Sequence, residues 1–348
     1  MSPFPGEAAL VEVLPNHRFD EPRLIEYLHR NLAGFDTPCR IRQFQGGQSN
    51  PTFHLSTPHG SFVLRKKPPG VLLPSAHAVD REFTIMRALA GTSVPVPRMM
   101  LLCNDTDIIG QTFYVMEYVP GRVLTDPALP ELPAAQRSKL FDSMNETLAH
   151  LHQVDIAGAG LAEFGRPQGF LTRQLSRWSR QYAAADLPPC AAMEHLAAWL
   201  HAQDPGPEEA AIQHGDFRLG NLLIHPTEPR VVAVLDWELA TLGHPLADLA
   251  YACLIYHGSV FAPGGPLKAG GGIPGEAQFV AAYCRRTGRG AIPNWHYFLA
   301  FSLFRAAAIL AGVYRRALEG NAADAHARER GAVYREVAEL GCSIAQAA

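Results

Sequence analysis

Residues 214–225 read HGDFRLGNLLIH, and residues 231–238 read VVAVLDWE. Each stretch holds a short apolar run, and a turn rich in proline separates the two runs, which predicts a β-hairpin. Asp216 and Asn221 precede the first run, and Asp236 follows the second. Because a hairpin brings its two ends together, we expect Asp236 to return to the neighbourhood of the loop that carries the other two side chains.

An Asp, an Asn five residues later and a second Asp beyond the next strand form the arrangement of kinase catalytic loops. In this interpretation Asp216 takes the proton of a substrate hydroxyl, and Asn221 and Asp236 bind Mg²⁺ on the phosphates of ATP. The alternative is that Asn221 and Asp236 are ordinary turn residues. His214 fits an orienting residue that holds the loop through backbone contacts better than it fits a base.

Length and composition limit the possibilities. A chain of 348 residues predicts two domains or lobes. A net charge of −3 argues against a nucleic-acid-binding protein. The six cysteines include no CxxC pair, and no signal peptide is visible, so we expect reduced thiols and a cytoplasmic location. The most apolar stretch, residues 295–314, contains Arg305 and predicts a buried helix rather than a membrane span.

Apolar periodicity predicts strands first and helices later along the chain. Residues 21–32 and 77–90 have helical spacing, and five segments have strand character: 41–44, 53–56, 61–65, 98–103 and 112–118. From residue 133 onward the pattern is mainly helical, with helices expected over 133–154, 170–186, 190–203, 245–256, 276–287, 294–319 and 324–346. The glycine-rich residues 263–275 lack the order of a phosphate-binding loop, so we expect a mobile loop near the substrate side.

The stretches 214–221 and 235–238 closely resemble the aminoglycoside phosphotransferase and choline kinase group, a branch of the protein-kinase-like fold. Residues 243–250, GHPLADLA, resemble the segment that follows in that family, although Gly-Asp-Pro is the commoner form and His244 is a departure. The resemblance implies an α+β, bilobal structure. Its N-terminal lobe, residues 1–118, would hold an antiparallel five-stranded sheet with one helix, and its C-terminal lobe, residues 119–348, would be mainly helical.

The resemblance also implies residue roles. Asp248 would be a structural acid that braces the catalytic loop, with a surface helix cap as the alternative. A cation on the third strand would anchor phosphates, and residues 62–65 place Arg65 there, with Lys66 next to it pointing to the opposite face. Glu82 on the following helix is the expected partner of Arg65. Asp80 is the runner-up, and an ordinary solvated acid is the alternative for Glu82.

The expected nucleotide contacts complete this set. Residues 46–50 lie where kinases fold a loop over the nucleotide, so Ser49 and Asn50 are candidate phosphate donors. Residues 113–119 resemble the last strand and hinge of the family, where adenine would hydrogen-bond to the backbone at Glu117 and Val119. These candidates rest on position, because neither segment has a specific spacing of its own.

The acceptor is expected to be a small hydroxylated molecule. From residue 257 onward there are ten Lys and Arg but six Asp and Glu, a balance of about +4 that favours an anionic or neutral acceptor. Residues 65–70, 73–77 and 240–243 resemble a subgroup found alone in bacteria or fused ahead of acyl-CoA dehydrogenase domains. That resemblance suggests a hydroxyacyl acceptor such as a 4-hydroxy acid or its CoA thioester.

Two other classes of function compete with an ATP-dependent kinase. A nucleotide-binding pseudokinase would act as a binding module, and Arg65 in place of lysine argues mildly for it. A metal-dependent hydrolase could use His214, Asp216 and Asp236 with His225 or His244, but the sequence lacks an HxH or HExxH ligand pair. We expect no nucleic-acid or membrane partner, and the sequence does not indicate an oligomeric state.

Overall fold

The computed structural model describes residues 9–45, 50–68, 78–320 and 326–347. The chain forms two compact units, each built from segments that are distant in sequence. The sheet unit comprises Met1–Thr125, Ala157–Leu161 and Leu219–Ala240, and the helical unit comprises Asp126–Ile156, Ala162–Arg218 and Thr241–Ala348. Residues 219–240 therefore pack with the sheet unit, although they follow residue 118 in the chain. The lobes expected over 1–118 and 119–348 stay a prediction.

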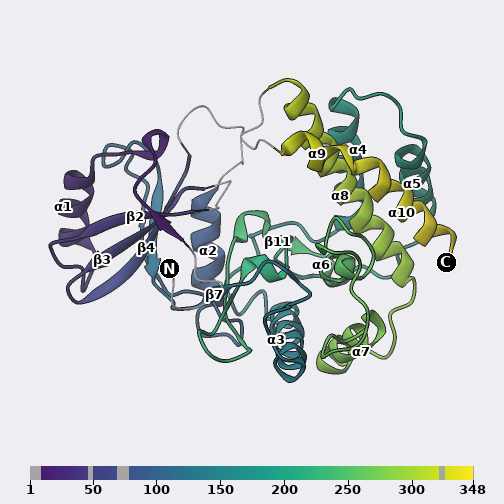
Figure 1. The fold of residues 1–348 in the computed structure, drawn as a ribbon, viewed down its shortest axis with the longest axis horizontal. Helices are drawn as coiled ribbons and strands as arrows, with labels where there is room; N and C mark the ends of the chain where they lie inside the picture. Colours follow the sequence, from purple (N-terminus) through teal and green to yellow (C-terminus); the bar gives the residue numbers. More distant parts are fainter. Residues whose placement is uncertain (1–8, 46–49, 69–77, 321–325, 348) are drawn as a thin grey trace. The chain divides into compact units, whose positions relative to one another are not determined.

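Within the described residues, the sheet unit contains a six-stranded antiparallel sheet in the order β1-β2-β3-β4-β6-β5 (Figure 1). The strands are β1 (Leu10–Val11), β2 (Arg40–Phe44), β3 (Thr52–Thr57), β4 (Gly60–Lys66), β5 (Met99–Cys103) and β6 (Phe113–Glu117). Strands β2 to β6 are the five that the sequence predicted. The additional β1 is a two-residue edge strand whose Leu10 pairs with Phe44.

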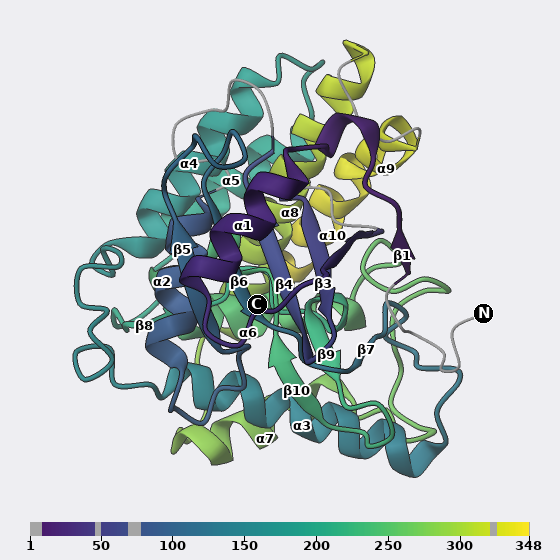
Figure 2. The ribbon, with the colours of Figure 1, turned by 90° about the vertical axis from the view of Figure 1, so that its left-hand side faces the viewer.

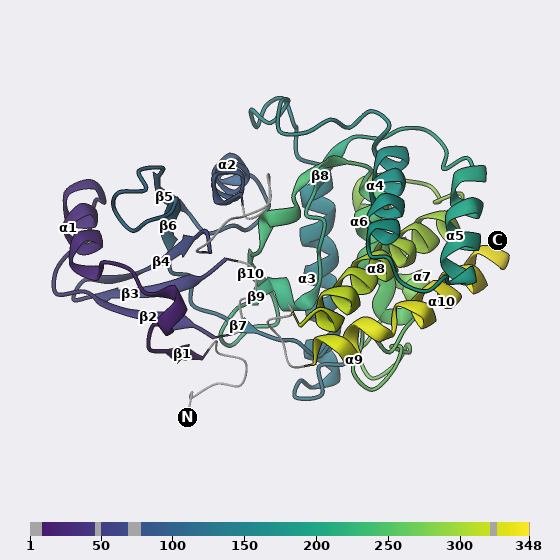
Figure 3. The same ribbon diagram turned by 90° about the horizontal axis from the view of Figure 1, so that it is seen from above.

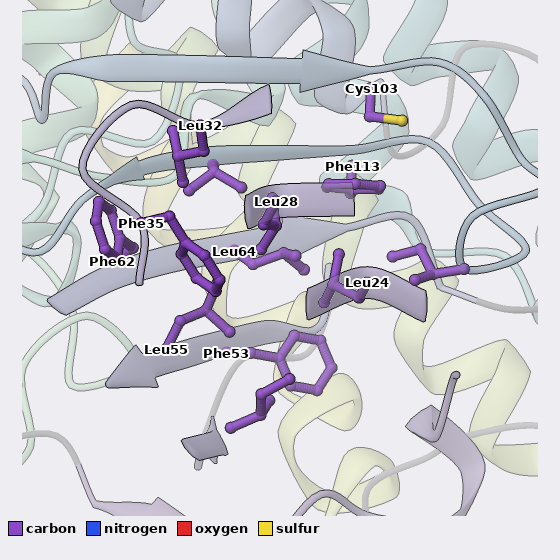
Figure 4. Close-up of a cluster of buried hydrophobic side chains, with 13 residues drawn as sticks. Leu24, Leu28, Leu32, Phe35, Phe53, Leu55, Phe62, Leu64, Cys103 and Phe113 are labelled. Atoms are coloured by element: carbon purple, nitrogen blue, oxygen red, sulfur yellow. The ribbon is translucent and has the colours of Figure 1, made fainter. Parts of the chain in front are cut away.

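Helices α1 (Glu21–Asn31) and α2 (Val79–Leu89) cover opposite faces of this sheet (Figures 1 and 2). The face toward α1 is apolar, and Figure 4 shows its side chains meeting those of the helix. The cluster joins Leu24, Leu28, Leu32, Phe35, Ile41, Phe53, Leu55, Phe62, Leu64, Cys103, Ile109, Phe113 and Val115. Because successive side chains of a strand point to opposite faces, the residues between these positions face α2.

Helix α1 begins where its sequence signals place it. The carboxylate of Asp20 accepts a hydrogen bond from the backbone N–H of Arg23 at 3.0 Å, and Pro22 occupies the first turn. Such a cap satisfies a backbone donor that has no partner inside the helix. Leu24 and Leu28 on its inner face are fully buried, so packing against the sheet stabilises the helix.

A second, smaller sheet of the sheet unit carries the predicted hairpin. Strands β9 (Leu222–Ile224) and β10 (Val231–Val234) pair antiparallel, and β7 (Arg122–Val123) joins the other edge of β9. The sequence predicted the hairpin but not β7, which is too short to show alternation. The pairing of Leu222 with Val234 places residues 221 and 235 at the same end of the hairpin.

The helical unit is organised around α8 (Trp295–Leu318), against which α4, α5, α6, α9 and α10 pack (Figure 3). The other helices are α3 (Ala134–His152), α4 (Phe170–Ala184), α5 (Ala191–Ala202), α6 (Pro245–Ala252), α7 (Glu276–Thr287), α9 (Ala327–Ala332) and α10 (Tyr334–Gln346). Strands β8 (Ala211–Gln213) and β11 (Thr241–Gly243) form a two-stranded sheet. The single helix expected over 324–346 is wrong in one respect, because Val333 separates α9 from α10.

Helix α8 is the one described helix that is long and apolar enough to cross a membrane by length and composition. Its most apolar 18-residue window is 72% buried inside the structure. Because most of this window is buried, α8 is a core helix, as the sequence predicted. The helix also contains the charged residue Arg305.

Candidate active site

A short loop after β8 carries the first candidate residues, and Asp248 fixes its backbone. The two carboxylate oxygens of Asp248 accept hydrogen bonds from the backbone N–H groups of His214 at 2.8 Å and Gly215 at 2.9 Å. Asp248 lies in the first turn of α6 and is 2% exposed. It is therefore a buried brace of the loop and not a surface helix cap.

His152 of α3 contacts the Asp248 carboxylate and helps to hold it in place. Its Nε2 lies 3.4 Å from Oδ2 of Asp248, and its Nδ1 lies 2.7 Å from the hydroxyl of Tyr283. Burial alone would raise the pKa of the Asp248 carboxyl, but the hydrogen bond from His152 and the donors of the loop hold it below its usual value. The brace therefore depends on a carboxylate that stays ionised.

The departure at His244 has a structural explanation. Its Nδ1 accepts a hydrogen bond from the backbone N–H of Leu246 at 3.3 Å, so the imidazole caps α6 as an Asp at this position would. The ring is 3% exposed and packs 4.8 Å from the ring of Phe298. Burial lowers the pKa of His244, which favours the neutral form that this cap requires.

Asp216 lies on the braced loop, where three side chains hold it. Its backbone N–H donates to Nδ1 of His214 at 3.2 Å, so His214 orients the loop. The Asp216 carboxylate accepts from Nε of Arg218 at 3.2 Å and from the hydroxyl of Tyr251 on α6. Its side chain is 21% exposed, which leaves it accessible to a substrate.

The sheet unit holds the second group, at the open end of the β9–β10 hairpin, opposite the turn. The backbone N–H of Leu235 donates to the carbonyl of Asn221 at 2.9 Å, so the hairpin brings Asn221 and Asp236 together. Asp236 has φ 65° and ψ 61°, the left-handed region, which a side-chain-bearing residue occupies at a cost. Unusual backbone of this kind gathers at functional sites.

Asp236 belongs to a partly buried set of charges centred on Arg65. Nη2 of Arg65 donates to Oδ1 of Asp236 at 2.8 Å, and Nε of Arg65 lies 2.9 Å from Oε2 of Glu82. Strand β4, helix α2 and the end of β10 thus each contribute one charged side chain. Asp80 does not take part, because it is exposed and lies 3.8 Å from Nζ of Lys67.

Glu82 is 1% exposed, and its carboxylate has further polar partners. Oε1 accepts from Nδ2 of Asn50 at 2.7 Å, and Oε2 accepts from the hydroxyl of Tyr114 at 3.1 Å. Burial raises the pKa of Glu82, and the Arg65 cation and these hydrogen bonds offset part of that effect. Burial would lower the pKa of Arg65, but Glu82, Tyr114 and Asp236 raise it, so Arg65 stays charged.

Lys66 points away from this set, as strand alternation predicts. It is 1% exposed, and its Nζ lies 3.1 Å from Oε1 of Gln111 and 5.7 Å from the ring centroid of Phe19. Burial lowers the pKa of Lys66 to about 8. Arg65 is therefore the cation of β4 that faces Glu82 and Asp236.

The remaining nucleotide candidates have different environments. The side-chain amide of Asn50 is buried and donates to Oε1 of Glu82, so it helps to hold the carboxylate that faces Arg65. The backbone N–H of Glu117 donates to the carbonyl of Arg98 at 3.0 Å. The backbone of Val119, after the end of β6, has no hydrogen-bond partner in the described part of the chain. Ser49 lies outside the described residues.

Residues 40–301 match the sequence profile of the phosphotransferase enzyme family (APH). The chain belongs to this family. A structure from Ralstonia eutropha assigned as an aminoglycoside phosphotransferase is 43% identical, covers 95% of this chain and 99% of that chain, and superimposes with a TM-score of 0.87. Choline kinase from Cryptosporidium parvum is 14% identical, with 93% and 96% of the two chains covered and a TM-score of 0.63. These neighbours confirm the α+β, protein-kinase-like fold.

Longer proteins contain a segment similar to this chain. Acyl-CoA dehydrogenase family member 11 of Homo sapiens is 46% identical over 325 residues, which cover 91% of this chain and 42% of that protein. Acyl-CoA dehydrogenase family member 10 of Mus musculus is 44% identical over 332 residues, with 92% and 31% covered. The chain thus spans less than half the length of these relatives.

The donor set of this family member suits magnesium. Among the described residues no group of three or more His, Cys, Asp and Glu could hold a metal ion. Magnesium needs fewer protein ligands, because one or two oxygen donors act together with substrate phosphates and water. The carboxylate of Asp236 keeps Oδ2 without a partner in the described residues, and Asn221 adds an amide oxygen at the same hairpin end.

Three contacts of the phosphotransferase site were not predicted from the sequence. Tyr251 and Arg218 hold the Asp216 carboxylate, and Arg305 donates a hydrogen bond to the carbonyl of Gly215. Arg218 lay within the motif itself, where its distance of two residues from Asp216 was a usable signal. Tyr251 and Arg305 gave no local signal, because they sit on apolar helices and meet the loop only in the folded chain.

Proposed function

We propose that this phosphotransferase moves the γ-phosphoryl group of ATP, with Mg²⁺, to a hydroxyl of a small molecule. The observation that carries the proposal is the ion-pair set of Arg65, Glu82 and Asp236, because strand cation, helix acid and hairpin acid meet there as phosphoryl transfer requires. Asp216 lies five residues before Asn221, and Asn221 lies at the same hairpin end as Asp236.

The residues then divide the reaction among them. The acceptor oxygen attacks the γ-phosphorus, the bond to the bridging oxygen of ADP breaks with its electron pair, and Asp216 takes the proton of the acceptor hydroxyl. Arg65, held by Glu82, donates to phosphate oxygens and offsets their charge. Asn221 and Asp236 would hold Mg²⁺, which when bound would offset negative charge on the phosphates.

ATP as the phosphoryl donor is supported by solved structures of the same fold. One hygromycin-modifying aminoglycoside phosphotransferase was solved as a ternary complex with ADP and hygromycin B. A spectinomycin phosphotransferase was solved with ADP and spectinomycin. In this chain the backbone of Val119 and the carbonyl of Glu117 would receive the adenine ring.

A hydroxyacyl compound is the acceptor that we propose, as a 4-hydroxy acid or its CoA thioester. Two longer relatives are named acyl-CoA dehydrogenase family members 11 and 10, and these names point to acyl compounds. The positive balance after residue 257 disfavours polycationic aminoglycosides. A cytoplasmic location, expected from the six scattered cysteines, stays a prediction.

The test compares Asp216→Asn with the parent in an assay of ADP formation with Mg-ATP and 4-hydroxy acids, their CoA thioesters, choline and aminoglycosides. We expect transfer to a hydroxyacyl compound and a loss of kcat of about 10²-fold or more in the variant, the usual contribution of a general base. Asp142→Asn on the exposed part of α3 is the matched control and should keep the parental rate.

Two results would contradict the proposal. Equal rates for Asp216→Asn and the parent, together with ATP binding, would instead favour a pseudokinase that acts as a binding module. Efficient transfer to choline or aminoglycosides without transfer to any hydroxyacyl compound would show that the acceptor class is wrong.

A further inference from the structure

Arginine and aromatic side chains form a continuous series of contacts that ends at Asp216. Nε of Arg218 bonds the carboxylate at 3.2 Å, and the hydroxyl of Tyr251 bonds it as well. The guanidinium carbon of Arg305 lies 4.9 Å from the ring centroid of Tyr251 and 5.7 Å from that of Trp178. Guanidinium groups stack favourably on aromatic faces, which holds such a series in place.

Arg177 extends the series on α4, where its guanidinium carbon lies 5.1 Å from the ring centroid of Trp178. We call Arg177, Arg218 and Arg305 the arginine ladder. Helices α4 and α6, which carry Trp178 and Tyr251, both pack against α8, which carries Arg305 (Figure 3).

The arginine ladder lacks matching negative charge. In the described residues, only one of its three guanidinium groups has a carboxylate partner, which is the Arg218 group with Asp216. Arg305 donates to a carbonyl, and Arg177 has no carboxylate partner there. Arg218 is 53% exposed and bonds Asp216 through Nε, so its two Nη groups stay available.

A buried donor lies within the same series. The indole ring of Trp178 is 6% exposed, and its Nε1 has no hydrogen-bond partner in the described part of the structure. A buried N–H without an acceptor is costly, so a ligand oxygen that reached it would be stabilised. Positive charge and this donor both match an anion.

We propose that the arginine ladder binds an anionic group of the acceptor, so that Asp216 acts on hydroxyl compounds that carry a carboxylate or a phosphate. This inference rests on the proposed phosphotransfer. The anion belongs to the acceptor and not to ATP, because the ladder lies in the helical unit. Arg65 and Asp236, which we propose for the phosphates of ATP, lie in the sheet unit. A polycationic acceptor would meet the ladder with like charge, which disfavours binding.

The test uses three probes with the same reacting hydroxyl and the full chain with Mg-ATP. They are 4-hydroxybutanoate, 4-hydroxybutanoyl-CoA and the neutral 1,4-butanediol. We expect one of the anions to exceed the diol in kcat/KM by tenfold or more. Arg177→Gln and Arg218→Gln should each reduce this preference about tenfold, the effect of losing one charge-assisted hydrogen bond. A ratio between probes cancels effects on catalysis that all three share.

Arg328→Gln removes the same charge from an exposed site on α9 and should leave the preference unchanged. A preference for the free acid identifies a carboxylate as the bound anion, and a preference for the thioester identifies the phosphates of its carrier. Far-UV circular dichroism and thermal midpoints show that each variant is folded.

Calorimetric titration of both anions without ATP separates the two proposals. Binding that weakens in the Arg177 and Arg218 variants, without any phosphoryl transfer in the parent, would overturn the proposed function and support the ladder. Equal use of diol and anions, variants with an unchanged preference, or a parent that binds neither anion would overturn the ladder.

Discussion

Glu82 is the side chain on which the charged set of the sheet unit depends most, because it contacts Arg65, Asn50 and Tyr114. A buried ion pair that loses one partner leaves a desolvated charge behind. Arg65 would keep Asp236 but lose its buried counter-ion. The variant Glu82→Gln should therefore affect both stability and nucleotide binding.

We expect Glu82→Gln to lower the free energy of unfolding by about 3 kcal/mol, the lower end for breaking a buried pair. It should also raise KM for ATP, because Arg65 would no longer be held toward the phosphates. Urea denaturation and steady-state kinetics measure the two effects. Asp80→Asn, two residues earlier on α2 and exposed, is the control, and an equal loss in both variants would contradict the prediction.

Asp248 makes a pH-dependent contribution to the helical unit. Its pKa is below the ordinary value of about 3.9 in the folded chain, so its stabilisation is complete above about pH 4 and is lost as the pH falls through the folded-state pKa. Asp248→Asn should cost about 3 kcal/mol at pH 7. Urea denaturation at pH 7 and pH 3.5 should show a smaller difference from the parent at the lower pH, and a constant difference would disprove this account.

Among single residues, the sequence predicted the roles of those whose neighbours follow from a motif or from strand alternation. Asp216, Asn221 and Asp236 have fixed spacings, and Arg65 and Lys66 separate to two faces because the strand period is two. The burial of Asn50 against Glu82 was not predictable, because nothing local indicates that a loop residue reaches a helix 32 positions later.

Among the elements, the glycine-rich connection before α7 illustrates how a loop is fixed by one close approach. A Cβ on Gly272 would overlap the backbone carbonyl of Ala134 at the start of α3, and φ of Gly272 is +89°. Arg137 of α3 holds the same region through the carbonyls of Leu129 at 2.9 Å and Gly271 at 3.4 Å. Contacts of this kind anchor the described loop to α3.

Gly272→Ala should therefore destabilise the chain more than Gly264→Ala, whose φ of +86° is similar but whose Cβ would meet open space. We expect about 1 kcal/mol for Gly264→Ala from backbone strain alone. Gly272→Ala should cost at least about 3 kcal/mol, because the Ala134 backbone must also move. Thermal or urea unfolding compares them, and equal losses would show that the overlap is relieved without cost.

Element prediction succeeded where periodic patterns are long. The helix over 133–154 and α3 agree within two residues at each end, because apolar spacing persists for several turns. Strands β7, β8 and β11 have two or three residues, too few for alternation to appear. The break at Val333 was also invisible, since no proline marks it and Gly331 lies inside α9.

For the whole molecule, the two units interleave along the chain. The sheet unit takes residues 219–240 from beyond three helices of the other unit, and Asp236 from that segment pairs with Arg65. Helix α2 also packs against the turn at Trp237–Leu239. A fragment that ends before these residues lacks part of its own packing.

A fragment of residues 1–125 should therefore have a lower midpoint of thermal unfolding than the full chain. Its transition should also be broader. Circular dichroism melting of fragment and full chain measures the difference. Adding Asp236→Ala to the full chain should shift its transition toward that of the fragment. A fragment as stable as the intact chain would show that the 219–240 segment contributes little.

The separation of Arg65 and Lys66 onto two faces of β4 has a consequence for chemical labelling. Reagents that acylate an amine beside bound nucleotide find no target at Arg65, because a guanidinium that stays charged is a poor nucleophile. The neighbouring amine of Lys66 is buried against Phe19 and Gln111 on the far side of the sheet. A reagent designed to acylate an amine at the anchoring position of β4 would therefore not react there in this protein.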